Sequence, residues 1–151
     1  NVFNFDYEKD IKNISRNYYE RVLITIMAII ITRRHNGKEA LTCSELAHTY
    51  TIPIQLVSRA INDLLHVELI APTPVENDFA YIATVDSNDL TIGKLLRLID
   101  DHGSKDFVDS INNKATQNDV LGNINKICYD NASQALVADI PIPQESDQTS
   151  Y

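Results

Sequence analysis

The chain has 151 residues, of which 44% are hydrophobic and 7% aromatic, which is enough to bury one ordinary core. It carries 21 acidic residues against 13 basic ones, and its formal net charge of -8 disfavours nonspecific adhesion to nucleic acid or to an anionic membrane. Its cysteines, Cys43 and Cys128, lie far apart and predict free thiols in a reducing compartment. The chain begins at Asn1 without an initiator methionine, so we expect it to be part of a longer protein.

The first predicted elements are an N-terminal arm over residues 1–14 and a long helix that Ser15 caps. This helix continues to about His35, where Asn36-Gly37 provides a left-handed stop. The stretch from Val22 to Ile31 is apolar almost all round, yet it is too short to span a bilayer. It therefore predicts either a core helix or a helix that pairs with a second copy of the chain.

The stretch from Leu41 to Ile70 predicts a helix-turn-helix. Thr42 and Glu45 have the spacing of a capping box at the start of a short first helix. Pro53 breaks the chain and begins a second helix that extends to about Glu68, with apolar residues at three- and four-residue spacing on one side. The other side faces a partner, and its candidate contact residues are Gln55, Ser58, Arg59, Asn62 and His66.

Two short strand-like runs, residues 69–71 and 79–83, follow the second helix and predict a hairpin wing. Pro72 and Pro74 between them cannot donate to a sheet, so at least one strand should lie at an edge. The predicted fold is mainly α with a small β-hairpin, a winged helix-turn-helix with an extra N-terminal arm and helix and a C-terminal helix.

The rest of the chain predicts two more helices and a tail. The first is capped by Thr91 or Ser87 and stopped by Gly103, and the second extends from about Gln117 to about Ala138. The last segment has the composition of a flexible tail. The predicted units are residues 1–14 as the arm, 15–104 as the winged-helix domain, 105–138 as a helical extension and 139–151 as the tail.

Residues for catalysis or metal binding are not evident in the sequence. The glycines are isolated, which excludes a phosphate-cradling loop, and the histidines lack metal-ligand spacing. His102 follows Asp100 and Asp101, but a histidine at a helix C-terminus is favoured by the helix dipole alone. We therefore expect no enzyme activity, no cofactor, no metal and no small-molecule substrate.

A winged helix can bind DNA or another protein, and the formal charge of its surface helps to decide between these two functions. Between Thr42 and Thr84, Arg59 is the single Lys or Arg against five acidic residues, a formal charge of -4. Phosphate contacts by basic side chains dominate DNA affinity, so this balance favours a protein partner. Arg33, Arg34 and Lys38 would supply a basic edge if they lay beside the second helix.

Four segments together resemble a known family: Ile14–Tyr19, Leu41–Ile70, Leu90–Leu96 and Asp100–Ser104. They are similar to the cytoplasmic C-terminal region of YihY/BrkB-family inner-membrane proteins of Bacteroides-type bacteria, a family formerly labelled ribonuclease BN. The resemblance covers about residues 1–107. It implies a domain on the cytoplasmic side of the inner membrane that follows membrane spans, and it transfers no catalytic residue.

The shorter pattern of the helix-turn-helix and the Leu90–Gly93 run also resembles iron-sulfur and redox-sensing winged-helix repressors. Those proteins carry clustered cysteines near the helix after the wing. No cysteine lies between Thr84 and Ser104 here, so we do not expect cluster sensing.

The leading hypothesis is a noncatalytic interaction or regulatory module of a multi-pass inner-membrane protein. Its partner would be the membrane portion or another copy of the chain, with a homodimer through Val22 to Ile31 as one possibility. The first alternative is a DNA-binding transcriptional regulator of the winged-helix type. The second alternative is part of a tRNA-processing ribonuclease BN, a name widely regarded as misassigned.

Overall fold

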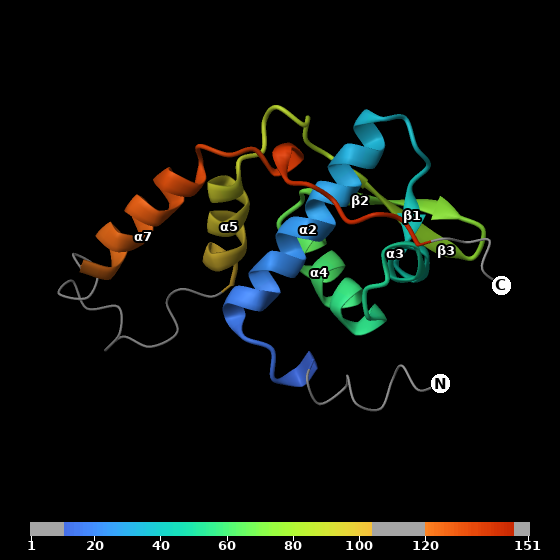
Figure 1. The fold of residues 1–151 in the computed structure, drawn as a ribbon, viewed down its shortest axis with the longest axis horizontal. Helices are drawn as coiled ribbons and strands as arrows, with labels where there is room; N and C mark the ends of the chain where they lie inside the picture. Colours follow the sequence, from blue (N-terminus) through green and yellow to red (C-terminus); the bar gives the residue numbers. More distant parts are fainter. Residues whose placement is uncertain (1–10, 104–119, 147–151) are drawn as a thin grey trace.

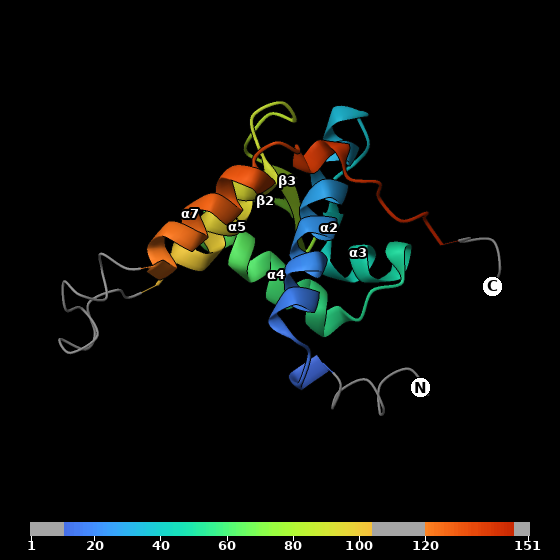
Figure 2. The same cartoon turned by 60° about the vertical axis from the view of Figure 1, so that its left-hand side comes forward.

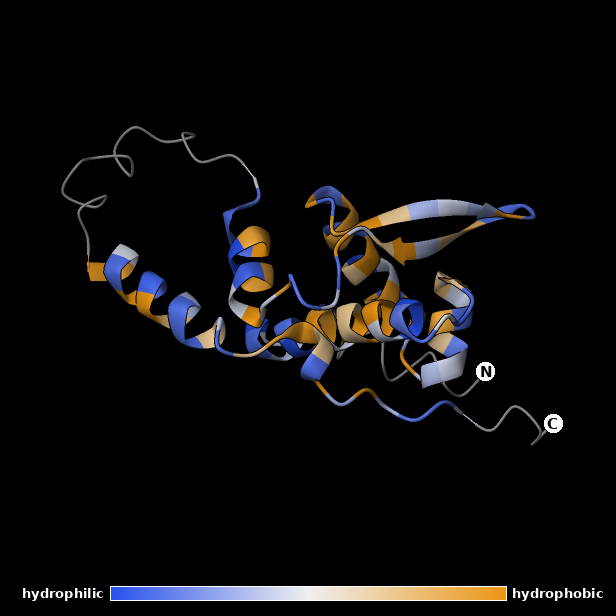
Figure 3. Ribbon diagram, turned by 90° about the horizontal axis from the view of Figure 1, so that it is seen from above, coloured by the Kyte–Doolittle hydropathy of each residue, from blue (hydrophilic) through white to orange (hydrophobic). Residues whose placement is uncertain are grey.

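A computed structural model of the chain describes residues 11–103 and 120–146. The model folds into a helical body from which a hairpin projects (Figures 1 and 3). The elements in chain order are α2 (Arg16–His35), β1 (Leu41–Thr42), α3 (Cys43–Tyr50), α4 (Ile54–His66), β2 (Ile70–Val75), β3 (Asp78–Ala83), α5 (Ile92–Asp101), α7 (Val120–Ala132) and the 3-10 helix η1 (Val137–Asp139). Within the described ranges, no helix combines the length and hydropathy needed to cross a membrane.

Helix α2 crosses the middle of the body and begins and ends where the sequence predicts (Figure 1). The Ser15 hydroxyl accepts a hydrogen bond from the Tyr18 N–H at 3.1 Å, which satisfies one of the free donors of the first turn. At the other end Gly37 has a φ of 68°, the left-handed conformation that glycine adopts without strain. Both predicted helix signals are confirmed.

The apolar stretch of α2 is used inside the single chain. Residues from Ile26 to Ile31 keep between 0 and 5% of their surface exposed, and they form the centre of the hydrophobic core. A homodimer through Val22 to Ile31 stays a prediction, but the single chain leaves little of this stretch for a second copy to cover.

The helix-turn-helix also forms as predicted. The Thr42 hydroxyl and the Glu45 carboxylate accept hydrogen bonds from each other's backbone N–H, both at 3.1 Å, and this is the predicted capping box. Helix α4 begins after Pro53 and ends at His66, two residues short of the predicted end. Its buried stripe fixes which side faces outward and consists of Leu56, Val57, Ala60, Ile61 and Leu64.

The wing is part of a three-stranded antiparallel sheet in the order β1-β3-β2. The sequence predicted the hairpin but missed β1, which is only two residues long and pairs Leu41 with Tyr81. It also ended the first strand too early, because β2 continues through Pro72 and Pro74. These prolines are two residues apart on an edge strand, so both can turn their missing donor to the open side.

Helix α5 starts at the Thr91 cap, whose hydroxyl accepts the Lys94 N–H at 3.0 Å, so the Ser87 alternative is wrong. Helix α7 lies beside α5 in both views and ends at Ala132, before the predicted Ala138 (Figures 1 and 2). The predicted start at Gln117 lies outside the described residues. No residue of α7 is buried, and its exposed large apolar side chains are Val120, Leu121, Ile124 and Ile127.

The predicted flexible tail is wrong for the part that the structure describes. Ile140 and Ile142 pack on the core cluster, which also includes the fully buried Val137 just before the predicted tail. The chain then crosses α2 and reaches α3 (Figure 1), where the Ser146 N–H donates to the Thr49 carbonyl at 2.6 Å. We call residues 140–146 the C-terminal strap. Residues 1–10 of the predicted arm, 104–119 of the predicted extension and 147–151 of the predicted tail lie outside the described residues.

Candidate nucleic-acid interface

The five predicted contact residues lie together on the outward side of α4, opposite its buried stripe. The spacing of the apolar residues forces this arrangement, because a helix that buries one stripe turns the intervening positions to solvent. Four of these side chains are exposed and one is half-buried. The exposed ones are Gln55, Arg59, Asn62 and His66, and the half-buried one is Ser58.

One edge of this face borders the sheet. Ser58 lies beside Cys43 at the start of α3, and Cys43 in turn lies beside Tyr81 of β3. Burial raises the pKa of the Cys43 thiol, and the neighbouring hydroxyls of Tyr81 and Ser58 offset this only in part. Cys43 and Cys128 are both free thiols, as predicted. Cys43 is half-buried and Cys128 is exposed. The raised pKa keeps the Cys43 thiol protonated at neutral pH.

The opposite edge of the face is organised by Tyr19 of α2. The guanidinium carbon of Arg59 stacks 3.7 Å from the centroid of the Tyr19 ring. The hydroxyl of the same tyrosine donates a hydrogen bond to the carboxylate of Asp63, one turn further along α4. Burial, followed by this hydrogen bond, raises the pKa of Tyr19, so the hydroxyl stays a donor at neutral pH.

This cluster lines a hollow of about 440 Å³ between the start of α2, α4 and the end of α5. On the far side, Asp100 of α5 accepts hydrogen bonds from Arg16 at 3.1 Å and from the Tyr129 hydroxyl of α7 at 2.6 Å. Burial, followed by the hydrogen bond to Asp100, raises the pKa of Tyr129 to about 12. Polar contacts thus join α7 to α5 and α5 to α2 beside the outward side of α4.

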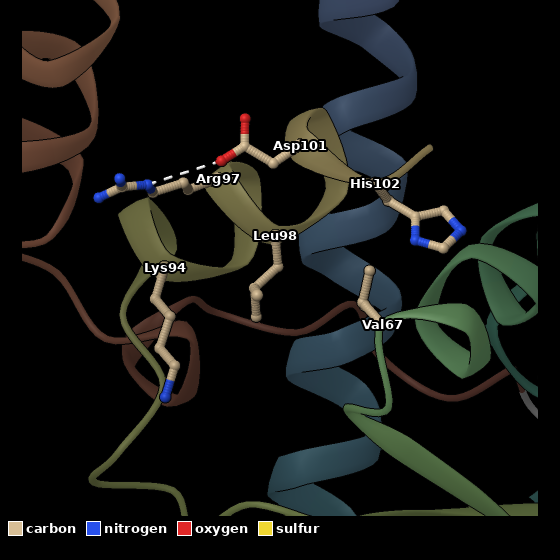
Figure 4. A pocket seen from close by; sticks show the side chains of 6 residues that line it. All are labelled: Val67, Lys94, Arg97, Leu98, Asp101 and His102. Atoms are coloured by element: carbon tan, nitrogen blue, oxygen red, sulfur yellow. Dashed lines mark ion pairs between the residues drawn. The ribbon is translucent and has the colours of Figure 1, made fainter. Parts of the chain in front are cut away.

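At the C-terminal end of α4, His66 stacks on His102 with ring centroids 5.4 Å apart and an interplanar angle of 15°. His102 is the C-cap residue of α5, which confirms its predicted place at a helix end. Next to it, a second hollow of about 340 Å³ is lined by α5 residues and Val67 (Figure 4). Lys94 and Arg97 stand at this hollow, and Arg97 approaches Asp101 at 3.7 Å.

The three residues of the predicted basic edge are engaged within the molecule. Arg33 donates to the Glu39 carbonyl and, at 2.7 Å, to the Glu145 carboxylate of the strap. Lys38 reaches the same carboxylate at 3.3 Å, and Arg34 donates to the Ala83 carbonyl. In this structure the edge therefore supports the strap and the end of β3 rather than presenting free charge.

Among the described residues, no group of three or more His, Cys, Asp or Glu side chains could hold a metal ion. The expected lack of enzyme activity remains a prediction. The residue that sequence reasoning missed is Tyr19, which lies near the start of α2. Its position before a cluster of aliphatic residues carries no local signal for contact with α4.

A helix-turn-helix followed by a hairpin wing is the winged-helix fold, and comparisons with solved structures agree. CymR of B. subtilis, titled a global cysteine regulator, matches with a TM-score of 0.56 at 13% identity over 84% of this chain and 94% of that chain. CymR of Staphylococcus aureus matches with a TM-score of 0.55 at 14% identity over 82% and 98%. IscR of T. potens gives 0.53 at 16% identity, over 84% of each chain.

At these identities the likeness establishes the fold alone. No protein-family model matches the chain, and no curated protein matches it. The chain is therefore similar to winged-helix regulators in architecture, over nearly their full length.

Proposed function

We propose that the protein is a DNA-binding transcriptional regulator of the winged-helix type that contacts the major groove through α4. The observation that carries this proposal is the exposed face of α4, where all five predicted contact residues lie on one side between the sheet and Tyr19. The structural neighbours named as regulators support it. From the sequence alone we favoured a protein partner over DNA. The winged-helix fold leads us to place DNA binding first.

The side chains on this face have the chemistry that base recognition requires. Gln55 and Asn62 can each donate to and accept from adenine, and Arg59 between them can donate two hydrogen bonds to guanine. The residues at 55, 59 and 62 are three and four positions apart, so they follow one another along a single groove-facing line. The proposed reaction is noncovalent recognition and needs no catalytic group.

The acidic balance of the domain then sets how the protein binds. With one basic residue against five acidic ones between Thr42 and Thr84, the winged unit gains little from phosphate contacts. Nonspecific affinity should be low, and most of the affinity for a target should come from base contacts. A shallow salt dependence is therefore part of the proposal.

The test is a salt titration of binding to a duplex selected by the protein from a random library. Arg59→Ala should lower affinity for that duplex by about five- to hundred-fold, the value of one bidentate base contact. The matched control is Lys126→Ala, which removes an exposed charge from α7. Equal effects of the two substitutions would contradict a specific role for α4.

A second candidate, a protein-interaction module, has its own supporting observation. Large apolar side chains are exposed on the wing, and they are Val75, Phe79 and Ile82. The negative formal charge of the same unit favours a protein partner over the negatively charged backbone of nucleic acid. Failure of the protein to select any duplex would favour this candidate. A YihY/BrkB-type membrane parent and a ribonuclease remain predictions on which no comparison bears.

A further inference from the structure

Arg59 is the single Lys or Arg of the winged unit, and it is followed four residues later by Asp63. On an isolated helix, side chains at this spacing face each other and form an ion pair. In this structure they do not, since no ion pair joins them among the described residues and Tyr19 of α2 contacts both. The Tyr19 ring stacks on the Arg59 guanidinium, and the Tyr19 hydroxyl donates a hydrogen bond to the Asp63 carboxylate.

We propose that Tyr19 is a positioning residue that keeps Asp63 away from Arg59, so that the guanidinium stays free to contact a guanine in the major groove. This inference rests on the proposed DNA-binding function and names the residue outside the helix-turn-helix on which that function depends.

The geometry supports this role in two ways. A guanidinium that stacks through its face keeps its N–H donors in the plane of the group, where they can still form a bidentate contact with guanine O6 and N7. Tyr19 retains only 7% of its exposure, so its ring is fixed by the core and cannot follow Arg59 into solvent. The ring therefore provides a fixed surface against which the guanidinium is held.

Tyr19 also determines whether the Asp63 carboxylate can interact with Arg59. Asp63 would otherwise offer Arg59 an internal ion-pair partner that competes with DNA. Because the tyrosine hydroxyl donates to that carboxylate, Asp63 is satisfied without the guanidinium. Removing the hydroxyl alone should release Asp63 while leaving the stack in place.

The experiment measures affinity for the selected duplex in the wild-type chain, Tyr19→Phe, Asp63→Asn and the double variant. Tyr19→Phe, which keeps the ring and the packing, should weaken binding about two- to five-fold. Asp63→Asn in the Tyr19→Phe background should restore the affinity of Asp63→Asn alone. Replacing the contacted guanine with 7-deazaguanine should reduce the difference between wild type and Tyr19→Phe, because it removes N7, one of the two acceptors of the bidentate contact.

Unchanged affinity of Tyr19→Phe, or the same loss with and without Asp63→Asn, would overturn this inference while duplex selection by the wild type still upheld the proposed function. A wild-type chain that selects no duplex would overturn both. The thermal unfolding of each variant is recorded alongside, since a merely structural role of Tyr19 would lower stability without any rescue of DNA affinity by Asp63→Asn.

Discussion

Glu145 and Arg33 form an ion pair at 2.7 Å although 112 positions separate them in the sequence. The same carboxylate also receives hydrogen bonds from Lys38 and from the Tyr50 hydroxyl. Beside it, the Ser146 hydroxyl donates to the His48 carbonyl at 2.9 Å, near the C-terminal end of α3. The strap thus ties the C-terminal part of the chain to the helix-turn-helix.

The strap should be sensitive to acid. The hydrogen bond and charge of Lys38, followed by those of Arg33, lower the pKa of Glu145 below its ordinary value. A lowered pKa stabilises the docked strap at pH values above the ordinary glutamate pKa, and this contribution is lost as the pH falls from the ordinary pKa through the lowered pKa of the docked state. Glu145→Gln should therefore expose the strap at neutral pH and remove its pH dependence.

The measurement is amide hydrogen exchange at Ser146, corrected for the intrinsic effect of pH. Its N–H is protected only while the strap lies on α3, through the bond to Thr49. Gln144→Ala, an exposed neighbour without a described side-chain bond, is the matched control. Identical protection in the wild type and Glu145→Gln at every pH would show that the ion pair does not hold the strap.

The capping box at the start of α3 should contribute measurably to stability. Thr42→Ala removes the acceptor for the Glu45 N–H, and loss of such a cap costs about 1 kcal/mol. Urea unfolding should report this loss in the free energy of unfolding. Ser44→Ala, at an exposed position two residues after Thr42, should change the free energy of unfolding by less than about 0.5 kcal/mol. An equal loss in both variants would refute the capping role of Thr42.

Gly93 is required for the contact between α5 and α7. A Cβ at this position would collide with the backbone oxygen of Tyr129 and lie 2.8 Å from the Ser133 nitrogen. Gly93→Ala should therefore destabilise the protein by about 1–3 kcal/mol, as overpacking does when backbone must move. Lys94→Ala, at the exposed neighbouring position, serves as the control in the same thermal unfolding series. Stability equal to the control would show that α7 does not lie on α5 in solution.

The apolar side chains of α7 should contribute little to the stability of the single chain. Ile127 is 61% exposed, whereas Leu95 on α5 is fully buried. Ile127→Gln should change the free energy of unfolding by no more than about 0.5 kcal/mol, and Leu95→Ala should lower it by about 2–5 kcal/mol. A large loss for Ile127→Gln that grew as the protein was diluted would mean that this face is covered in solution.

Local signals in the sequence predicted most of the fold. The Ser15 cap, the Thr42 capping box and the stop at Gly37 depend on neighbours within a few residues, so they could be identified without the tertiary structure. The outward side of α4 followed from apolar periodicity in the same way. These features gave the winged-helix class and the candidate contact residues.

The features that the sequence did not reveal depend on contacts between distant segments. Nothing near Tyr19 signals that its ring meets α4, and nothing near Glu145 signals Arg33. The composition of the tail predicted flexibility because hydrogen bonds to the end of α3 cannot be anticipated from it. Strand β1 was missed because a strand of two residues has no alternation to detect.

The central claim is that α4 contacts specific bases in duplex DNA, and the most direct test is repeated selection of bound duplexes from a random library. We expect the wild-type chain to enrich a defined sequence containing guanine, and we expect Arg59→Ala to lose the preference at that guanine while Lys126→Ala keeps it. No enriched sequence at any salt concentration from low to physiological, a range over which surface charges go from weakly to strongly screened, would contradict the claim.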